Sequence, residues 1–130
     1  MRKKVIPALV LLSLMLTGCA SPAPQAGAYR QVTMQEAVEM MEAEKGYIIL
    51  DVRTEQEFAS GHIPGAVLLP NESIGTEDPD CLPDKDQLIL VYCRSGNRSK
   101  QASDKLARLG YTNVVEFGGI NSWPGEIETE

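Results

Sequence analysis

The sequence predicts an α/β fold with a central parallel sheet of five strands flanked by helices. From residue 29 onwards, compact apolar segments alternate with segments of helical periodicity, a pattern typical of parallel sheets. Two of the helical segments open with a capping-box sequence, and glycines stand where the helices should end. Five strand candidates and three helices are enough to enclose one hydrophobic core.

The first strand candidate, residues 29–32, leads directly into a helix. Thr33 and Glu36 form a capping box, apolar residues then recur on one helical face, and Gly46 ends the helix. Residues 47–50 form the second apolar strand. This stretch supplies the first strand, helix and strand of the alternation.

A second capping box, made by Thr54 and Glu57, begins a short helix before the strand at residues 66–69. The polar segment at residues 71–86 contains two prolines and six acidic residues. We expect a loop there, with at most one helical turn near residues 72–74.

The last third of the chain begins with the most apolar strand candidate, residues 88–92. A seven-residue loop follows it and leads into a helix at residues 100–109. A strand at residues 114–117 and a short closing helix near residues 120–123 complete the predicted fold.

The loop after residue 92 has the sequence Cys93-Arg94-Ser95-Gly96-Asn97-Arg98-Ser99. A strand that ends beside a helix N-terminus directs several unpaired backbone N–H groups at one spot, which favours an anion. A free thiol is only a few per cent thiolate at pH 7, and lowering its pKa by about two units raises that fraction to roughly three quarters. The loop therefore predicts that Cys93 is a nucleophilic thiolate.

The N-terminal segment has the pattern of a lipoprotein signal peptide at residues 1–18. A basic start precedes an apolar stretch of about 12 residues, too short to cross a bilayer. It ends in Leu16-Thr17-Gly18-Cys19, which resembles a lipobox, so Cys19 is expected to be lipidated. An ordinary signal peptide is the alternative. The small, proline-rich residues 19–28 have the composition of a tether.

The net charge of −6 also bears on partners. Removal of residues 1–18 would take away three of 12 basic residues and no acidic one, which gives −9. Such a chain repels nucleic acid and anionic lipid, so membrane attachment would depend on acyl chains. We therefore expect an extracytoplasmic, membrane-anchored lipoprotein at the cell surface or facing the periplasm.

Three motifs, in order along the chain, resemble those of the rhodanese family. They are Asp51-Val52-Arg53 with Glu57-Phe58 and Gly61-His62-Ile63-Pro64-Gly65-Ala66; Val91-Tyr92-Cys93-Arg94-Ser95-Gly96; and Gly118-Gly119-Ile120 with Trp123. The resemblance covers nearly all of residues 30–125. It implies a rhodanese-like domain at residues 29–126 and a catalytic cysteine that carries sulfane sulfur as a persulfide.

By this resemblance, Cys93 attacks the outer sulfur of a small anionic donor such as thiosulfate, and a thiol or cyanide accepts the sulfur. Arg94 and Arg98 are expected to attract the donor and assist the departing sulfite. Gly96 permits the tight backbone of the cradle. The resemblance implies no cofactor, and with His62 as the only histidine we expect no metal cluster.

The polar loop residues have expected roles as well. Ser95 and Asn97 are candidates for side-chain hydrogen bonds, and Ser99 is predicted to cap the following helix. Asp51 ends a strand on the side where α/β sheets form their sites. It either supports the cysteine loop or pairs with Arg53.

Two other functions remain open from the sequence. Cysteine phosphatases and arsenate reductases on a related fold hold an oxyanion in a loop of Cys, five residues and Arg. Here Ser99 occupies that position and the arginine, Arg98, comes one residue earlier, which leaves a smaller cradle. A non-catalytic module that binds a partner or carries sulfur is the second alternative.

Three further residues have competing interpretations. Cys81 is either a resolving thiol for Cys93 or a loop cysteine without a role. His62 is expected to bond the backbone of its turn. Arg53 and Glu57 are four residues apart near a helix start and are predicted to form an ion pair.

Overall fold

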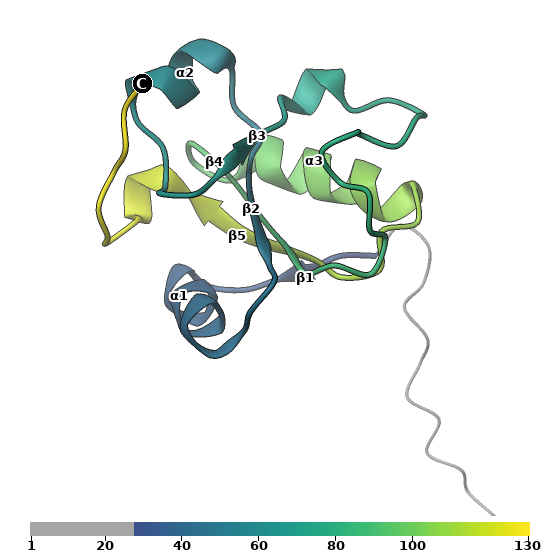
Figure 1. Cartoon of the computed structure of the whole chain (residues 1–130), viewed down its shortest axis with the longest axis horizontal. Helices are drawn as coiled ribbons and strands as arrows, with labels where there is room; N and C mark the ends of the chain where they lie inside the picture. Colours follow the sequence, from purple (N-terminus) through teal and green to yellow (C-terminus); the bar gives the residue numbers. More distant parts are fainter. Residues whose placement is uncertain (1–27) are drawn as a thin grey trace, which may run out of the picture.

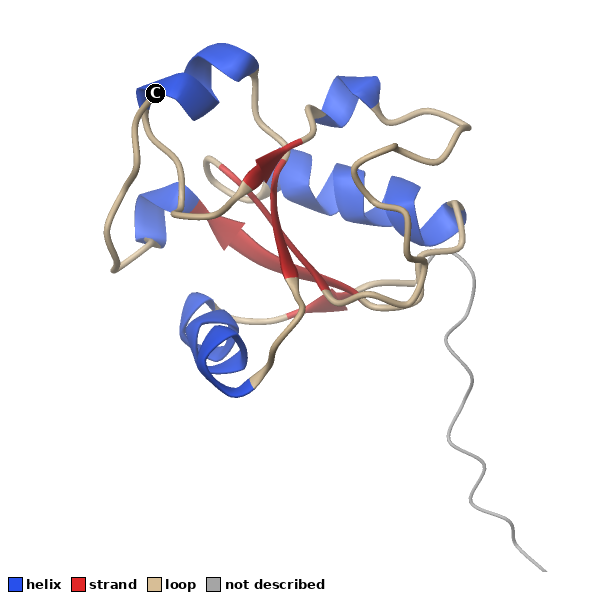
Figure 2. Cartoon of the chain, in the orientation of Figure 1, coloured by secondary structure: helices blue, strands red, loops and turns tan. Residues whose placement is uncertain are grey.

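Five parallel strands form one sheet in the computed structural model, which describes residues 28–130 (Figures 1 and 2). The strands are β1 (Arg30–Gln31), β2 (Ile48–Asp51), β3 (Val67–Leu68), β4 (Ile89–Cys93) and β5 (Val114–Gly119). They lie in the order β1-β5-β4-β2-β3 and every neighbouring pair is parallel. The predicted fold class is confirmed.

The helices also follow the sequence pattern. They are α1 (Met34–Ala43), α2 (Glu55–Ser60) and α3 (Asn97–Arg108), with 3-10 turns η1 (Asn71–Ser73) and η2 (Ile120–Ser122). Both predicted capping boxes form: Thr33 with Glu36 begins α1, and Thr54 with Glu57 begins α2.

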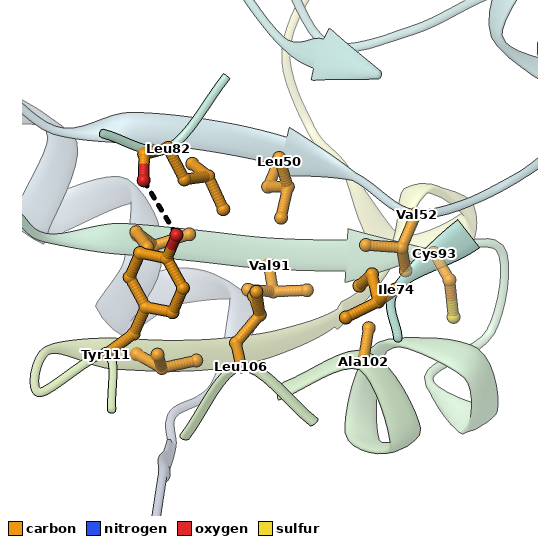
Figure 3. Close-up of a cluster of buried hydrophobic side chains, with 11 residues drawn as sticks. Leu50, Val52, Ile74, Leu82, Val91, Cys93, Ala102, Leu106 and Tyr111 are labelled. Carbon is orange, nitrogen blue, oxygen red and sulfur yellow. Dashed lines mark hydrogen bonds between the residues drawn. The ribbon is translucent and has the colours of Figure 1, made fainter. Parts of the chain in front are cut away.

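Side chains alternate between the two faces of the sheet, and a helix covers each face. On one face Ala37 of α1 packs with Leu90 and Val115 of the central strands. On the other, Leu106 of α3 packs with Leu50 and other strand side chains, as Figure 3 shows. The central strand β4 is buried along its whole length, which fixes the position of the residue at its end.

Helix α3 begins at Asn97, three residues earlier than predicted. Gly96 is the residue before the helix, with φ of 113°, a left-handed conformation that favours glycine. The prediction that Ser99 caps the helix is therefore wrong, because Ser99 lies within its first turn.

The chain leaves β4 towards β5 on one side and leaves β2 towards β3 on the other. In open α/β sheets, sites form at the carboxyl ends of the strands, at the point where the strand order reverses in this way. Asp51 and Tyr92 are register partners at the ends of β2 and β4, and Cys93 is the next residue.

The predicted signal peptide at residues 1–18, Cys19 and the tether up to residue 27 lie outside the described residues. No helix within residues 28–130 has both the length and the apolar character needed to cross a membrane.

Candidate active site

The sulfur of Cys93 lies in a cradle at the end of β4, where the side chain is visible in Figure 3. Cys93 is only 1% exposed. Its Sγ accepts a hydrogen bond of 3.0 Å from the backbone N–H of Gly96 and lies 3.4 Å from the hydroxyl oxygen of Ser99. The loop and the first turn of α3 therefore direct hydrogen-bond donors at the sulfur.

Two opposing effects act on the Cys93 thiol. Burial alone would raise its pKa, because a buried thiolate loses hydration. Hydrogen bonds from Ser99 and from the backbone N–H groups of Ser99, Gly96 and Ser95 outweigh burial and hold the pKa below its ordinary value. This cysteine is thus poised to ionise, as a nucleophile or sulfur carrier requires.

A second glycine allows the cradle to close against the sheet. A side chain at Gly119 would overlap the carbonyl group of Arg94 and crowd the backbone nitrogen of Ser95. The backbone N–H of Asn121 donates to the same Arg94 carbonyl at 3.3 Å. The end of β5 and η2 therefore pack against the backbone of the cysteine loop and fix its position.

The hydroxyl of Ser99 belongs to the cradle. It lies 2.9 Å from the carbonyl oxygen of Gly96, on the preceding turn, and 2.6 Å from Oε1 of Glu116 on β5. Ser99 is fully buried and Glu116 is 3% exposed. The serine thus joins the cysteine loop to a buried carboxylate on the neighbouring strand.

Arg98 is committed to an ion pair. Its two terminal nitrogens donate to the two carboxylate oxygens of Glu57 at 2.7 and 2.9 Å, which ties α3 to α2. The hydrogen bond from Arg98 is the main cause that lowers the pKa of Glu57 to about 2. The predicted pair of Arg53 with Glu57 is wrong, since Arg53 binds Asp51 instead.

Asp51 and Arg53 form a buried pair beside the loop. The guanidinium of Arg53 donates to both carboxylate oxygens of Asp51, with a shortest distance of 2.7 Å, and also to the carbonyl of Gly61. The hydroxyl of Tyr92 donates to Asp51 at 2.7 Å. Asp51 therefore contacts Tyr92, the residue directly before Cys93. Within residues 28–130 the Asp51 side chain forms no hydrogen bond with a residue of the 93–99 loop.

The remaining loop residues face outwards. Arg94, Ser95 and Asn97 are exposed. Arg94 lines a cavity of about 310 Å³ between α2 and η2, with Glu57 and Asn121 among the other lining residues. A small anion that approaches the loop would meet the charge of Arg94 at this cavity.

Within residues 28–130 neither Cys81 nor His62 forms a side-chain hydrogen bond with the 93–99 loop. Cys81 and Cys93 are both free, and burial raises the pKa of the Cys81 thiol. His62 stacks on Phe58 and its Nδ1 lies 2.8 Å from the Phe58 carbonyl oxygen, in agreement with the predicted backbone bond. Within residues 28–130 no group of three or more potential metal ligands is gathered in one place.

Glu116 is a site residue that the sequence reasoning missed. It stands in Val114-Val115-Glu116-Phe117, a strand otherwise made of apolar residues. A charged residue inside a buried strand needs a polar partner. The single glutamate in this apolar strand therefore indicates a buried polar contact, and this is the signal by which the sequence could reveal Glu116.

Comparisons with known proteins find relatives of this chain in sequence and in fold. A family model described as a Rhodanese-like domain matches residues 33–126. The Escherichia coli K12 protein "Thiosulfate sulfurtransferase PspE" is 34% identical over 71 residues, which cover 55% of this chain and 68% of that protein. "Thiosulfate sulfurtransferase GlpE" of Haemophilus influenzae PittEE is 35% identical over 96 residues, 73% of this chain and 88% of that protein. The crystal structure of a rhodanese-like domain protein from Staphylococcus aureus superposes with a TM-score of 0.65 at 31% identity, and covers 78% of this chain and 98% of that one.

Proposed function

The chain belongs to the rhodanese family, and on this basis we propose that it is a sulfurtransferase whose Cys93 carries sulfane sulfur. The donor is a small anion such as thiosulfate, and the acceptor is a thiol or cyanide. The observation that carries the proposal is the cradle of N–H groups around a thiol whose pKa lies below its ordinary value. The names of the two sulfurtransferase relatives support the choice of donor.

The reaction divides into two displacements. The Cys93 thiolate attacks the outer sulfur of thiosulfate, the donor's S–S bond breaks, and sulfite leaves with the electron pair. The persulfide that forms has an anionic outer sulfur, for which the N–H groups of the loop are suitable donors. An acceptor thiolate or cyanide then attacks that outer sulfur and releases Cys93 as a thiolate.

The phosphatase alternative has less support. A phosphatase of this type needs a guanidinium directed at the oxyanion, six residues after the cysteine. Ser99 stands there, and the guanidinium of Arg98 is bound to Glu57. The cradle is therefore better suited to one sulfur atom than to a tetrahedral oxyanion.

Intact-mass analysis after incubation with thiosulfate tests the proposal. We expect a gain of about 32 Da, one sulfur, that maps to Cys93 and is removed by cyanide with formation of thiocyanate. The variant Cys93→Ser should lose the adduct while its thermal unfolding stays close to that of the wild type.

The variant Cys81→Ser is the matched control and should keep the adduct. An adduct that persists in Cys93→Ser and is lost in Cys81→Ser would remove Cys93 from the mechanism. Absence of the adduct combined with turnover of an aryl phosphate would favour a phosphatase, and absence of both would favour a binding module.

We further propose that Cys19 is lipidated and anchors the domain outside the cytoplasm. The support is the sequence alone, with its short apolar stretch and the residues up to Cys19. The full chain expressed in bacteria with labelled fatty acid should incorporate the label, and Cys19→Ser should not. Absence of label in the wild type, or equal label in both proteins, would contradict the lipid anchor.

A further inference from the structure

Glu116 is a buried carboxylate next to the cysteine cradle. In the sheet its neighbours are Gln31 on β1 and Val91 on β4, neither of them charged. Its Oε1 accepts a 2.8 Å hydrogen bond from the backbone N–H of Gly118 and lies 2.6 Å from the hydroxyl oxygen of Ser99. Within residues 28–130 no basic side chain forms an ion pair with it.

The Ser99 hydroxyl has a single hydrogen. The carbonyl oxygens of Gly96 and Gly118 lie within its reach, together with two acceptors whose choice bears on the thiol. One is Glu116, at a separation typical of a hydrogen bond between a hydroxyl and a carboxylate. The other is the Cys93 sulfur, 3.4 Å away. When the hydrogen points to Glu116, Ser99 presents a lone pair to the sulfur and favours the thiol. When it points to the sulfur, Ser99 favours the thiolate.

We propose that Glu116 is a positioning residue that acts through Ser99 to set the acidity of the Cys93 thiol. The carboxylate draws the Ser99 hydrogen away from the sulfur and adds a like charge nearby. Both effects oppose the N–H groups of the loop and keep the thiolate more basic than the cradle alone would make it. The functional consequence rests on the proposed sulfur transfer.

That consequence differs between the two half-reactions. Cys93 is the nucleophile when it takes sulfur from the donor and the leaving group when it gives sulfur to the acceptor. A more basic thiolate is a stronger nucleophile and a poorer leaving group. Glu116 therefore favours sulfur capture at the expense of sulfur release.

The other charged groups near the Cys93 sulfur are either paired with another residue or exposed, and a substitution at Glu116 leaves them as they are. On α3, Arg98 acts on Cys93 but is paired with Glu57 of α2, and Arg94 of the loop is exposed. At the ends of β2 and β4, the Arg53 side chain neutralises Asp51, which also accepts a hydrogen bond from the hydroxyl of Tyr92.

The substitution Glu116→Gln removes the charge at nearly constant shape. We expect the thiolate absorbance of Cys93, taken as the difference from matched proteins that also carry Cys93→Ser, to titrate at lower pH. The acid dissociation constant should rise roughly tenfold. In a Ser99→Ala background the same substitution should shift the titration much less. The exposed Glu42→Gln on α1 is the matched control and should leave it unchanged.

An unchanged or more basic titration in Glu116→Gln overturns the proposal. So does a shift of equal size in the Ser99→Ala background, because the charge would then act directly on the sulfur. Glu116→Asp keeps the charge, but its shorter side chain places the carboxylate farther from Ser99. This variant replaces Glu116→Gln in the test if the glutamine variant fails to fold. It should also titrate at lower pH, and an unchanged titration there overturns the proposal as well.

Rates separate this role from a merely structural one. At a pH where both proteins are fully thiolate, Glu116→Gln should load sulfur from thiosulfate roughly threefold more slowly and release it to cyanide faster. Slower release together with slower loading would contradict the proposal. If no variant forms a persulfide, the proposed function fails, while the thiolate titration still decides the role of Glu116.

Discussion

Replacing Glu57 by Gln should destabilise the domain through loss of the ion pair with Arg98. This pair joins α2 to the first turn of α3, across residues 41 positions apart in the sequence. Both side chains are 28% exposed, so water screens the pair only in part. The substitution keeps the shape of the side chain and an oxygen that can accept the capping hydrogen bond from Thr54.

The pKa of Glu57 gives the expected size of the effect. A fall from 4.5 to about 2 corresponds, at about 1.4 kcal/mol per unit, to an upper limit of about 3 kcal/mol. Screening of a partly exposed pair lowers this value, and part of the shift comes from Thr54. We expect Glu57→Gln to lower the free energy of unfolding by about 1–2 kcal/mol at pH 7.

The dependence on pH follows from the direction of the shift. The folded protein binds a proton at Glu57 more weakly than the unfolded chain does, so the ionised carboxylate stabilises the fold. This stabilisation is complete well above pH 4.5 and is lost as the pH falls through about 2. The difference between wild type and Glu57→Gln should fall to roughly two fifths of its neutral value by pH 3.

Urea unfolding at pH 7, 4 and 3 measures this difference. The control is Glu36→Gln, because Glu36 makes the same capping box with Thr33 and, within residues 28–130, has no ion-pair partner. Its cost should be smaller. Equal costs for the two variants, or a cost of Glu57→Gln that does not change with pH, would refute the role assigned to Arg98.

Three other substitutions test the cradle and the core. Gly119→Ala should displace the cysteine loop and slow sulfur loading by at least about tenfold in a folded protein, whereas Gly75→Ala, in open space, should load normally. Leu106→Ala should cost about 2–5 kcal/mol in urea unfolding and leave loading of the folded fraction unchanged. Asp51→Asn should cost about 3–5 kcal/mol, since it leaves the buried guanidinium of Arg53 without its counter-charge.

The sequence was sufficient for the fold because its signals are local. Capping boxes, glycine stops and apolar strands each depend on a few consecutive residues, and all five strands and the three helices form within three residues of the predicted positions. Helix α3 begins earlier than the sequence predicts because no side-chain cap marks its start. Gly96 supplies the turn, and its N–H group donates to the Cys93 sulfur.

The partners of the charged residues were less predictable from the sequence. A spacing of four residues favours an ion pair only inside a helix. Because α2 begins at Glu55, Arg53 lies before the helix and turns back to Asp51, while Glu57 reaches α3. Such choices depend on how distant elements are placed. The contact between Ser99 and Glu116 also joins different elements, and no local pattern predicts it.

The arrangement of charges explains why the main chain has to stabilise the sulfur. Arg53 and Arg98 are each held by a carboxylate, and the buried carboxylate of Glu116 opposes a thiolate. The remaining donors at the sulfur are the loop N–H groups and, when its hydrogen turns from Glu116 to the sulfur, the Ser99 hydroxyl. Backbone amides do not titrate and cannot swing away, so they keep their geometry while the sulfur changes between thiolate and persulfide. A guanidinium in their place would follow the anion, and it would bind the donor's oxygens as readily as the transferred sulfur.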